Sequence, residues 1–195
     1  MTLLVLIRHG PTEWNAARRL QGRSDIPLSA AGRASVHAWT VPDEFQTFHW
    51  VSSPLRRTVE TATLLLGTAP PTDPRLVEMS FGEWEGRTLA DLRAELGAEV
   101  AEREARGLDF QAPDGESPRQ VQDRVRPFLD EVAGGGRPAV AVTHKGVLRA
   151  VYAAAANWDM LGKPPEKLKD ACAHVFELAG DGAPAVHQLN IPLEA

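Results

Sequence analysis

The sequence lacks several features that would place it in a specialised class of protein. Cys172 is its one cysteine among 195 residues, which excludes a disulfide within the chain and a cluster of thiolate metal ligands. The apolar run at residues 3–7 is too short for a signal peptide or a membrane span, so we expect a cytoplasmic protein without a membrane partner. A net charge of -5 provides no basic surface for nucleic acid, which we therefore exclude as a partner.

What is present is typical of one soluble globular domain. Hydrophobic residues make up 43% of the chain and charged residues 24%, and no repeat or low-complexity segment interrupts it. We expect a single domain over residues 1–195, monomeric or homodimeric, since the sequence does not separate these two states. The acidic balance leaves a phosphate ester open as substrate, because a local cluster of arginine and histidine can bind an anion within an acidic protein.

Short apolar runs alternate with helical patterns along the chain. Strands are expected at residues 2–8, 49–52, near 75–78, 139–143, 172–178 and 185–190. Helices are expected after Ser29, from Ser53-Pro54 to Gly67, after Thr88, from Ser117 to about residue 133, and over 147–156. Ser53 is expected to cap the second of these helices, with Pro54 at its first helical position. This alternation predicts an α/β fold: a three-layer α/β/α sandwich with a mostly parallel central sheet flanked by helices.

Two histidines each follow a run that is typical of a buried strand. His9 comes after Arg8 in the stretch RHGPTEWN, and His144 comes directly after the apolar run at 139–143. Ligands of open α/β sheets bind at the carboxyl ends of the strands, so we expect both histidines at one sheet edge rather than in the core. Free N–H groups at the start of the following helix, near Gly146, would favour a phosphate oxygen.

Two further segments add an arginine and a carboxylate. Arg57 belongs to the stretch SSPLRRTVETA, another strand-to-helix turn, and its planar guanidinium suits phosphate, whereas Arg56 is expected at the periphery. Glu78 lies between two apolar residues, which favours a raised pKa and proton transfer. Glu83 and Glu85 are typical of a surface acidic loop, and the sequence leaves open whether either contributes to acid catalysis.

Together these groups predict phosphoryl transfer without a metal ion. The set contains two histidines, two arginines and one carboxylate, and its arginines would repel a metal ion while binding a phosphoryl dianion. Positioning and charge neutralisation would then supply most of the catalysis. We therefore expect no metal, no cofactor and a small phosphorylated substrate.

Each of these segments resembles a motif of the histidine phosphatase superfamily, the phosphoglycerate mutase-like proteins, in family order and over residues 3–150. The resemblance implies the phosphoglycerate mutase-like fold and a catalytic set of His9 as the nucleophile that becomes phosphohistidine, Glu78 as proton donor, and Arg8, Arg57 and His144 around the phosphoryl oxygens. It implies further phosphate contacts from Asn15 and Gln21. Lys145 departs from the family, where many members have glycine; we expect its backbone N–H to contact phosphate and its ammonium to favour an anionic substrate.

The mechanism that the resemblance implies has two steps. His9 attacks as neutral imidazole through one ring nitrogen, while the other donates to a backbone carbonyl that fixes the tautomer. Glu78 protonates the leaving oxygen and then deprotonates the water that attacks the phosphohistidine.

The phosphatase branch of the family is favoured over two alternatives. Mutases of the family carry insertions that keep water from the phosphohistidine, whereas residues 86–115 are short here and are expected to form a small cap-like segment over the site. The alternatives are a cofactor-dependent phosphoglycerate mutase and a non-catalytic phospho-ligand binding protein. The arginines of residues 86–115 are expected to pair with glutamates on a solvated helix face. The sequence does not identify the physiological phosphomonoester.

Overall fold

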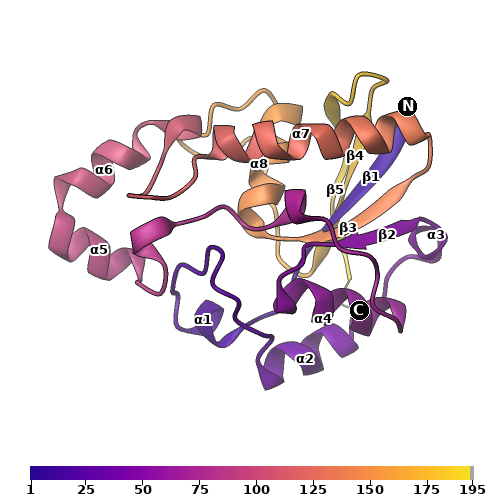
Figure 1. Ribbon diagram of the computed structural model, residues 1–195, viewed down its shortest axis with the longest axis horizontal. Coiled ribbons are helices and arrows are strands. Elements are labelled where there is room, and N and C mark those ends of the chain that lie inside the picture. Colours follow the sequence, from indigo (N-terminus) through magenta and orange to yellow (C-terminus); the bar gives the residue numbers. More distant parts are fainter. Residues whose placement is uncertain (194–195) are drawn as a thin grey trace.

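The computed structural model describes residues 1–193, which form one five-stranded sheet with helices on both faces (Figure 1). The strands are β1 (Thr2–Arg8), β2 (His49–Ser52), β3 (Ala139–Thr143), β4 (Cys172–Leu178) and β5 (Pro184–Pro192), in the order β2-β3-β1-β4-β5. Strands β2, β3 and β1 are parallel, and β4 and β5 are antiparallel to their neighbours. The predicted α/β class is confirmed, with a parallel centre and an antiparallel edge.

Alternate residues of the central strands enter two separate cores, which is why these strands are apolar on both faces. Leu4 and Leu6 pack with α7 (Pro118–Gly135) and α8 (Lys145–Ala155). Val5 and Ile7 pack in the other core, together with residues of α2 (Ala30–His37) and α4 (Arg56–Leu66). The single-turn helix α3 (Asp43–Gln46) adds Phe45 to this core. Another single-turn helix, α1 (Glu13–Ala16), lies in the loop after β1 and has no buried residue. The three layers follow from burial of both sheet faces.

The sheet register places the residues that follow three strands beside one another. Arg8 of β1 pairs with Thr143 of β3, and Ser52 of β2 pairs with Val142. One residue further along, the N–H of His9 donates to the Thr143 carbonyl at 3.0 Å. Two histidines and a serine turn, far apart in the sequence, therefore meet at one edge of the sheet, as predicted for the histidines.

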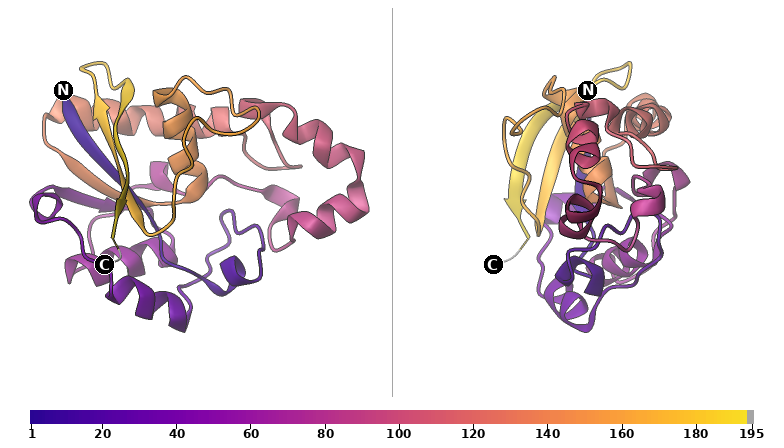
Figure 2. Two further views of the ribbon diagram at one scale, coloured as in Figure 1. Left: turned by 180° about the vertical axis from the view of Figure 1, so that it is seen from behind. Right: turned by 90° about the vertical axis from the view of Figure 1, so that its left-hand side faces the viewer.

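An arm of short helices extends to one side of the sheet (Figures 1 and 2). It contains α5 (Leu89–Leu96), α6 (Ala98–Glu104) and the 3₁₀ turn η3 (Gly107–Asp109) around a small core with Trp84 and Leu92. Its ion pairs join Arg87 to Glu95, Arg93 to Glu104 and Arg103 to Glu99. The expected pairing of arginines with glutamates is confirmed for these three.

Two sequence-based expectations about local structure are wrong. Residues near 75–78 form no strand: Pro74–Leu76 is a 3₁₀ turn, η1, because the Asp73 carboxylate accepts the Arg75 N–H at 2.8 Å and caps it. Helix α4 begins at Arg56 rather than just after Ser53, since Leu55 is still extended (φ -70°, ψ 139°).

A further 3₁₀ turn, η2 (Gly82–Trp84), follows η1 in the chain. None of the helices between residues 1 and 193 has the length and apolar character to span a bilayer.

Candidate active site

His9 is held in the loop after β1 with one ring nitrogen engaged and the other available. Its Nδ1 lies 2.7 Å from the Gly10 carbonyl oxygen, which can only accept, so Nδ1 carries the proton and Nε2 has its lone pair. His9 as a whole is 5% exposed. Burial, with the nearby Arg8 and Arg57 guanidinium groups, holds the pKa of His9 well below its ordinary value. The ring is therefore neutral around neutral pH.

Helix α4 supports the loop that carries His9. The Gly10 N–H donates to the Thr61 hydroxyl at 3.0 Å, and that hydroxyl donates to the Arg57 carbonyl at 2.7 Å. A Cβ at Gly10 would lie 2.3 Å from Val36 of α2, so glycine is required by the close approach of this helix. Thr61 belongs to a predicted motif, but its supporting contact is visible only in the fold.

His144 packs edge-on against His9, with ring centroids 5.3 Å apart and an angle of 60° between the planes. It is fully buried, and its Nε2 lies 2.7 Å from the Ser53 hydroxyl. Burial and Arg57 hold its pKa well below the ordinary value, so this ring is neutral as well. Its Nδ1 is buried and has no hydrogen-bond partner within the described chain. The sequence did not reveal the contact of Ser53 with His144, because the Ser53 hydroxyl was expected to cap a helix.

The two arginines that flank His9 are fixed in different ways. Arg57 is fully buried and donates to the carbonyls of Ser24 and Gly22, at 2.8 Å each. Arg8 pairs with Asp170 at 2.5 Å. The Nε atoms of both arginines are buried and lack a partner among residues 1–193. Arg56 lies at the periphery, as expected, with its side chain 60% exposed.

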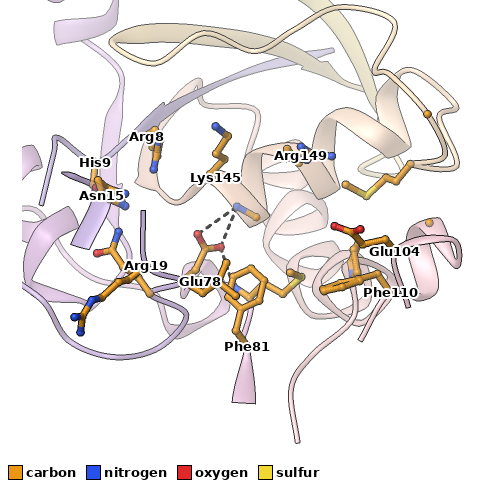
Figure 3. A pocket seen from close by; sticks show the side chains of 18 residues that line it. Arg8, His9, Asn15, Arg19, Glu78, Phe81, Glu104, Phe110, Lys145 and Arg149 are labelled. Atoms are coloured by element: carbon orange, nitrogen blue, oxygen red, sulfur yellow. Dashed lines mark hydrogen bonds between the residues drawn. The ribbon is translucent and has the colours of Figure 1, made fainter. Parts of the chain in front are cut away.

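Glu78 lies across the site from His9 and is also buried. Its Oε1 accepts from the Met79 N–H at 2.8 Å and from the Gly146 N–H at 3.0 Å (Figure 3). The N–H of Gly146, expected to be free for phosphate, is therefore bonded to a carboxylate. Burial raises the pKa of Glu78 and outweighs these hydrogen bonds and the nearby arginines, which lower it. A carboxyl group in this environment can hold a proton for transfer.

Asn15 and Gln21 share one partner, Thr12. Its hydroxyl lies 2.9 Å from Gln21 Oε1 and 3.1 Å from Asn15 Oδ1, and the Thr12 N–H donates to Asn15 Oδ1 at 3.0 Å. With their oxygens in this network, the two amide NH₂ groups are the donors left for a ligand.

A cavity of about 550 Å³ joins these groups to the arm. Figure 3 shows Arg8, His9, Asn15 and Glu78 on one side of it, and Arg149, Glu104 and Phe110 on the other. Six of the eight predicted site residues line the cavity: Arg8, His9, Asn15, Gln21, Glu78 and Lys145. The other two, Arg57 and His144, are fully buried and do not line the cavity.

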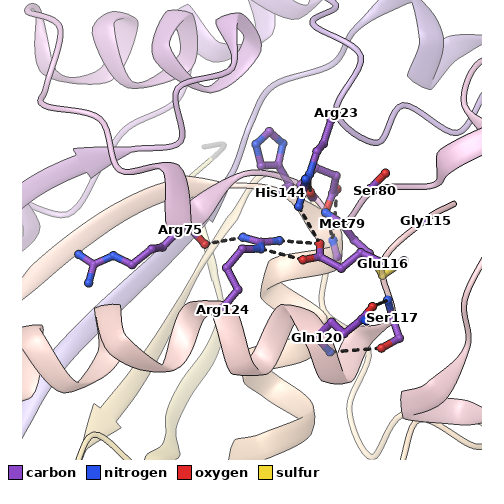
Figure 4. A network of polar contacts seen from close by, with 12 residues as sticks. Arg23, Arg75, Met79, Ser80, Gly115, Glu116, Ser117, Gln120, Arg124 and His144 are labelled. Atoms are coloured by element: carbon purple, nitrogen blue, oxygen red, sulfur yellow. Dashed lines mark hydrogen bonds and ion pairs between the residues drawn. The ribbon is translucent and has the colours of Figure 1, made fainter.

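A polar network fixes the backbone around Glu78 (Figure 4). Arg124 of α7 donates to both carboxylate oxygens of Glu116, at 2.9 and 2.8 Å, and to the Arg75 carbonyl at 2.5 Å. The Glu116 N–H donates to the Ser80 carbonyl at 2.8 Å. Helix α7 thus holds the chain on both sides of Glu78. Nothing in the sequence pattern pointed to Arg124.

Of the two remaining acids in that loop, only Glu85 is bonded into the site. Its carboxylate accepts from the N–H groups of Arg23 and Ser24, at 2.9 Å each, and from the Ser24 hydroxyl at 2.6 Å. This fixes the loop whose carbonyls hold Arg57, so Glu85 is not a free surface acid. Glu83 is exposed. Among the described residues, no group of three or more His, Cys, Asp or Glu side chains is arranged to hold a metal ion.

A family model of the histidine phosphatase superfamily (branch 1) matches residues 4–192. The chain belongs to this superfamily. This histidine phosphatase is 38% identical to the glucosyl-3-phosphoglycerate phosphatase of Mycolicibacterium vanbaalenii over 178 residues, covering 82% of this chain and 78% of the relative. It is 34% identical over 174 residues to the probable phosphoglycerate mutase GpmB of Yersinia enterocolitica, covering 85% and 77%.

Solved structures agree with the family assignment. The mycobacterial glucosyl-3-phosphoglycerate phosphatase in complex with VO3 superimposes with a TM-score of 0.79 at 30% identity, covering 100% of both chains. TTHB049 from Thermus thermophilus gives 0.75 at 32% identity, covering 97% of this chain and 98% of that one. The relatives named phosphatases are phosphoric monoester hydrolases, which confirms the predicted enzyme class at the level of the family.

Proposed function

We propose that this histidine phosphatase hydrolyses a small phosphomonoester through a phosphohistidine on His9, without a metal ion. The observation that carries the proposal is the fixed tautomer of His9: Nδ1 donates to Gly10, and a neutral Nε2 remains as nucleophile. Arg8 lines the cavity, and its Nε, the Nε of Arg57 and the Nδ1 of His144 lack a partner within residues 1–193. These nitrogens are the proposed donors to the phosphoryl oxygens. Asn15, Gln21 and the backbone of Lys145 add further contacts in this proposal.

The proposed reaction consists of two successive displacements at phosphorus. Nε2 of His9 forms a bond to phosphorus while the bond from phosphorus to the leaving oxygen breaks, and Glu78 gives that oxygen its proton. The Glu78 carboxylate then takes a proton from water, whose oxygen attacks phosphorus as the N–P bond breaks. Neutral His9, protonated Glu78 and inorganic phosphate result. The raised pKa of Glu78 suits both of its roles.

Positive charge within the protein supports metal-free catalysis. Arg8 and Arg57 are fixed near His9 by Asp170 and by backbone carbonyls, so their guanidinium groups need no reorganisation as charge develops on the phosphoryl group. The same charges disfavour a divalent cation at that position.

The names of the relatives give two candidates for substrate and reaction. Relatives that act on glucosyl-3-phosphoglycerate favour a phosphatase for a phosphorylated sugar acid, and we propose that residues 86–115 act as the cap that selects it, because Glu104, Gly107 and Phe110 line the cavity. The probable phosphoglycerate mutase among the relatives makes mutase activity the second candidate.

Hydrolysis of para-nitrophenyl phosphate and 3-phosphoglycerate in excess chelator tests the proposal. The wild-type protein, His9→Ala and the control His187→Ala, which changes an exposed histidine of β5, are compared. We expect turnover that resists chelator, is unchanged in the control and is lost in His9→Ala. Turnover that survives in His9→Ala would contradict the role of His9, and loss on chelation would contradict metal independence. Conversion of 3-phosphoglycerate to 2-phosphoglycerate, rather than release of phosphate, would favour the mutase.

A further inference from the structure

Two cations on α8 line the cavity without an acidic partner. Lys145 and Arg149 are four residues apart, so they lie on the same face of the helix, about 6 Å apart along its axis. Neither forms an ion pair within residues 1–193. Arg149 is half-buried, and its guanidinium stacks over the Trp158 ring with 5.3 Å to the centroid. That stacking fixes its direction and leaves its N–H groups for a ligand.

The acids near these two cations are already engaged. Asp170 pairs with Arg8 at 2.5 Å, and Glu104 of the arm pairs with Arg93 at 2.8 Å. Burial and the neighbouring Arg8 lower the pKa of Lys145, and Asp170 offsets only part of this effect. Burial also lowers the pKa of Arg149. The uncompensated positive charge at this end of the cavity destabilises the ligand-free protein, and a bound anion would neutralise it.

The position of the pair differs from that of the phosphoryl site. In Figure 3, Lys145 lies between Arg8 and Arg149, and Arg149 lies on the side of Glu78 away from His9. Glu78 is the proposed donor to the leaving oxygen, so Arg149 faces the organic part of the substrate rather than the transferred group. Phe81 and Phe110 lie across the cavity from the two cations, where they would contact carbon (Figure 3).

We infer that Lys145 and Arg149 bind a second anionic group on the organic part of the substrate. The substrate class is then a phosphomonoester that also carries a carboxylate or a second phosphate. The inference rests on the proposed phosphatase function, because that function assigns the leaving-group side of the cavity. It gives the Lys145 ammonium a separate role from its backbone N–H.

A matched pair of substrates tests the inference. 3-Phosphoglycerate and glycerol 3-phosphate differ only in a carboxylate against a hydroxymethyl group. We expect wild-type kcat/KM to favour 3-phosphoglycerate at least tenfold, roughly the contribution of one charged hydrogen bond. A second comparison uses propane-1,3-diol bisphosphate against its monophosphate. A preference in only one of the two comparisons identifies either carboxylate or phosphate as the second anion.

Three variants and one control separate a subsite from general charge steering. Arg149→Gln should lower kcat/KM for the doubly anionic substrate by about tenfold and leave para-nitrophenyl phosphate within about threefold. Lys145→Gln should lower the ratio of kcat/KM for the doubly anionic substrate to that for para-nitrophenyl phosphate by about tenfold. Arg149→Lys keeps the positive charge and should keep part of the preference for the doubly anionic substrate. This variant shows whether the loss in Arg149→Gln results from the missing charge or from misfolding. The control Lys163→Gln removes an exposed lysine outside the cavity lining and should change neither. Equal losses on all substrates would overturn the inference.

Direct binding keeps the two proposals distinguishable. If the wild-type protein hydrolyses none of these esters, the proposed function fails, and calorimetric binding of 3-phosphoglycerate against glycerol 3-phosphate then decides the subsite alone. Tighter binding of 3-phosphoglycerate that is lost in Lys145→Gln supports the inference. Equal binding of the two compounds overturns it.

Discussion

The two ends of the cavity are built differently. At the phosphoryl end, His9, Arg57 and His144 are at most 5% exposed, and each has a contact to a backbone carbonyl or a hydroxyl at 2.7–2.8 Å. At the arm end, a typical contact is the ion pair of Arg93 with Glu104, whose side chains are 57% and 38% exposed. The first end is preorganised by the sheet, as stabilisation of a developing charge requires. The second is a surface element with exposed ion pairs, and surface segments tolerate sequence change better than the sheet that they adjoin.

Removing the proposed proton donor should have the largest effect among the changes below. Glu78→Gln cannot protonate the leaving oxygen, so kcat/KM for glycerol 3-phosphate should fall by about 10²–10⁴. Para-nitrophenyl phosphate has a good leaving group, and its kcat/KM, which reports only steps through phosphorylation of His9, should change by no more than about threefold. Steady-state kinetics on both esters, with Glu83→Gln as control, measure this difference. Equal losses on both would contradict the role of Glu78.

Removing the contacts that hold the backbone around Glu78 should also lower kcat/KM for a poor leaving group more than for a good one, but by less than Glu78→Gln does. Arg124→Met removes the contacts to Glu116 and to the Arg75 carbonyl, so we expect kcat/KM for glycerol 3-phosphate to fall about tenfold. The loss on para-nitrophenyl phosphate should be less, and Arg124→Lys should restore part of the activity. Arg126→Met breaks an exposed ion pair on the same helix and serves as control. A loss that is independent of leaving group would show a structural role only.

The pH dependence should follow from burial at the phosphoryl end. Burial lowers the pKa of His9, so the neutral nucleophile persists as pH falls below the ordinary histidine value. Burial raises the pKa of Glu78, so the protonated donor persists above the ordinary glutamate value and is lost as pH rises through the raised one. Activity on alkyl phosphates should therefore be highest between these two pKa values.

The Glu78→Gln variant provides the control for this pH profile. The substrate phosphate itself titrates near pH 6, and that ionisation is common to both proteins. We expect the wild-type kcat/KM for glycerol 3-phosphate to fall on the basic side and the variant to lack this limb. The same basic limb in both proteins would assign it to another group.

A change in the arm should have the smallest effect. Arg93→Gln breaks the exposed pair with Glu104, and exposed pairs contribute less than about 1 kcal/mol to the free energy of unfolding. Urea denaturation should show a shift within that range, and kcat/KM for para-nitrophenyl phosphate should be unchanged. A large loss of turnover would mean that the arm orders the phosphoryl end, so that the two ends of the cavity are not independent.

The sequence was most informative where local pattern and buried position coincide. The bounds predicted for the strands at 49–52 and 139–143 are those of β2 and β3. Each has a short apolar centre, Trp50-Val51 in β2 and Ala139–Val142 in β3, with polar residues or proline close by on at least one side. Parallel strands then place His9 and His144 together without further information. Gly67 ends α4 in the left-handed conformation, as its position predicted.

The sequence was least informative where a side chain has a tertiary partner. Ser53 was expected to cap a helix, but its hydroxyl contacts His144, 91 residues away. The pairing of Arg8 with Asp170 and the contact of Arg124 with the Arg75 carbonyl likewise depend on how distant segments approach. Such contacts leave no spacing pattern, so only the fold could show them.

Trapping the covalent intermediate would show directly whether His9 is the nucleophile. The protein is mixed with para-nitrophenyl phosphate, quenched in alkaline denaturant, which preserves phosphohistidine, and its peptides are analysed by mass spectrometry. Glu78→Gln is included because it should form the intermediate readily and release it slowly. We expect one phosphoryl group on His9, most abundant in Glu78→Gln and absent from His9→Ala. Turnover with no phosphoryl group on His9, or a phosphoryl group on another residue, would contradict it.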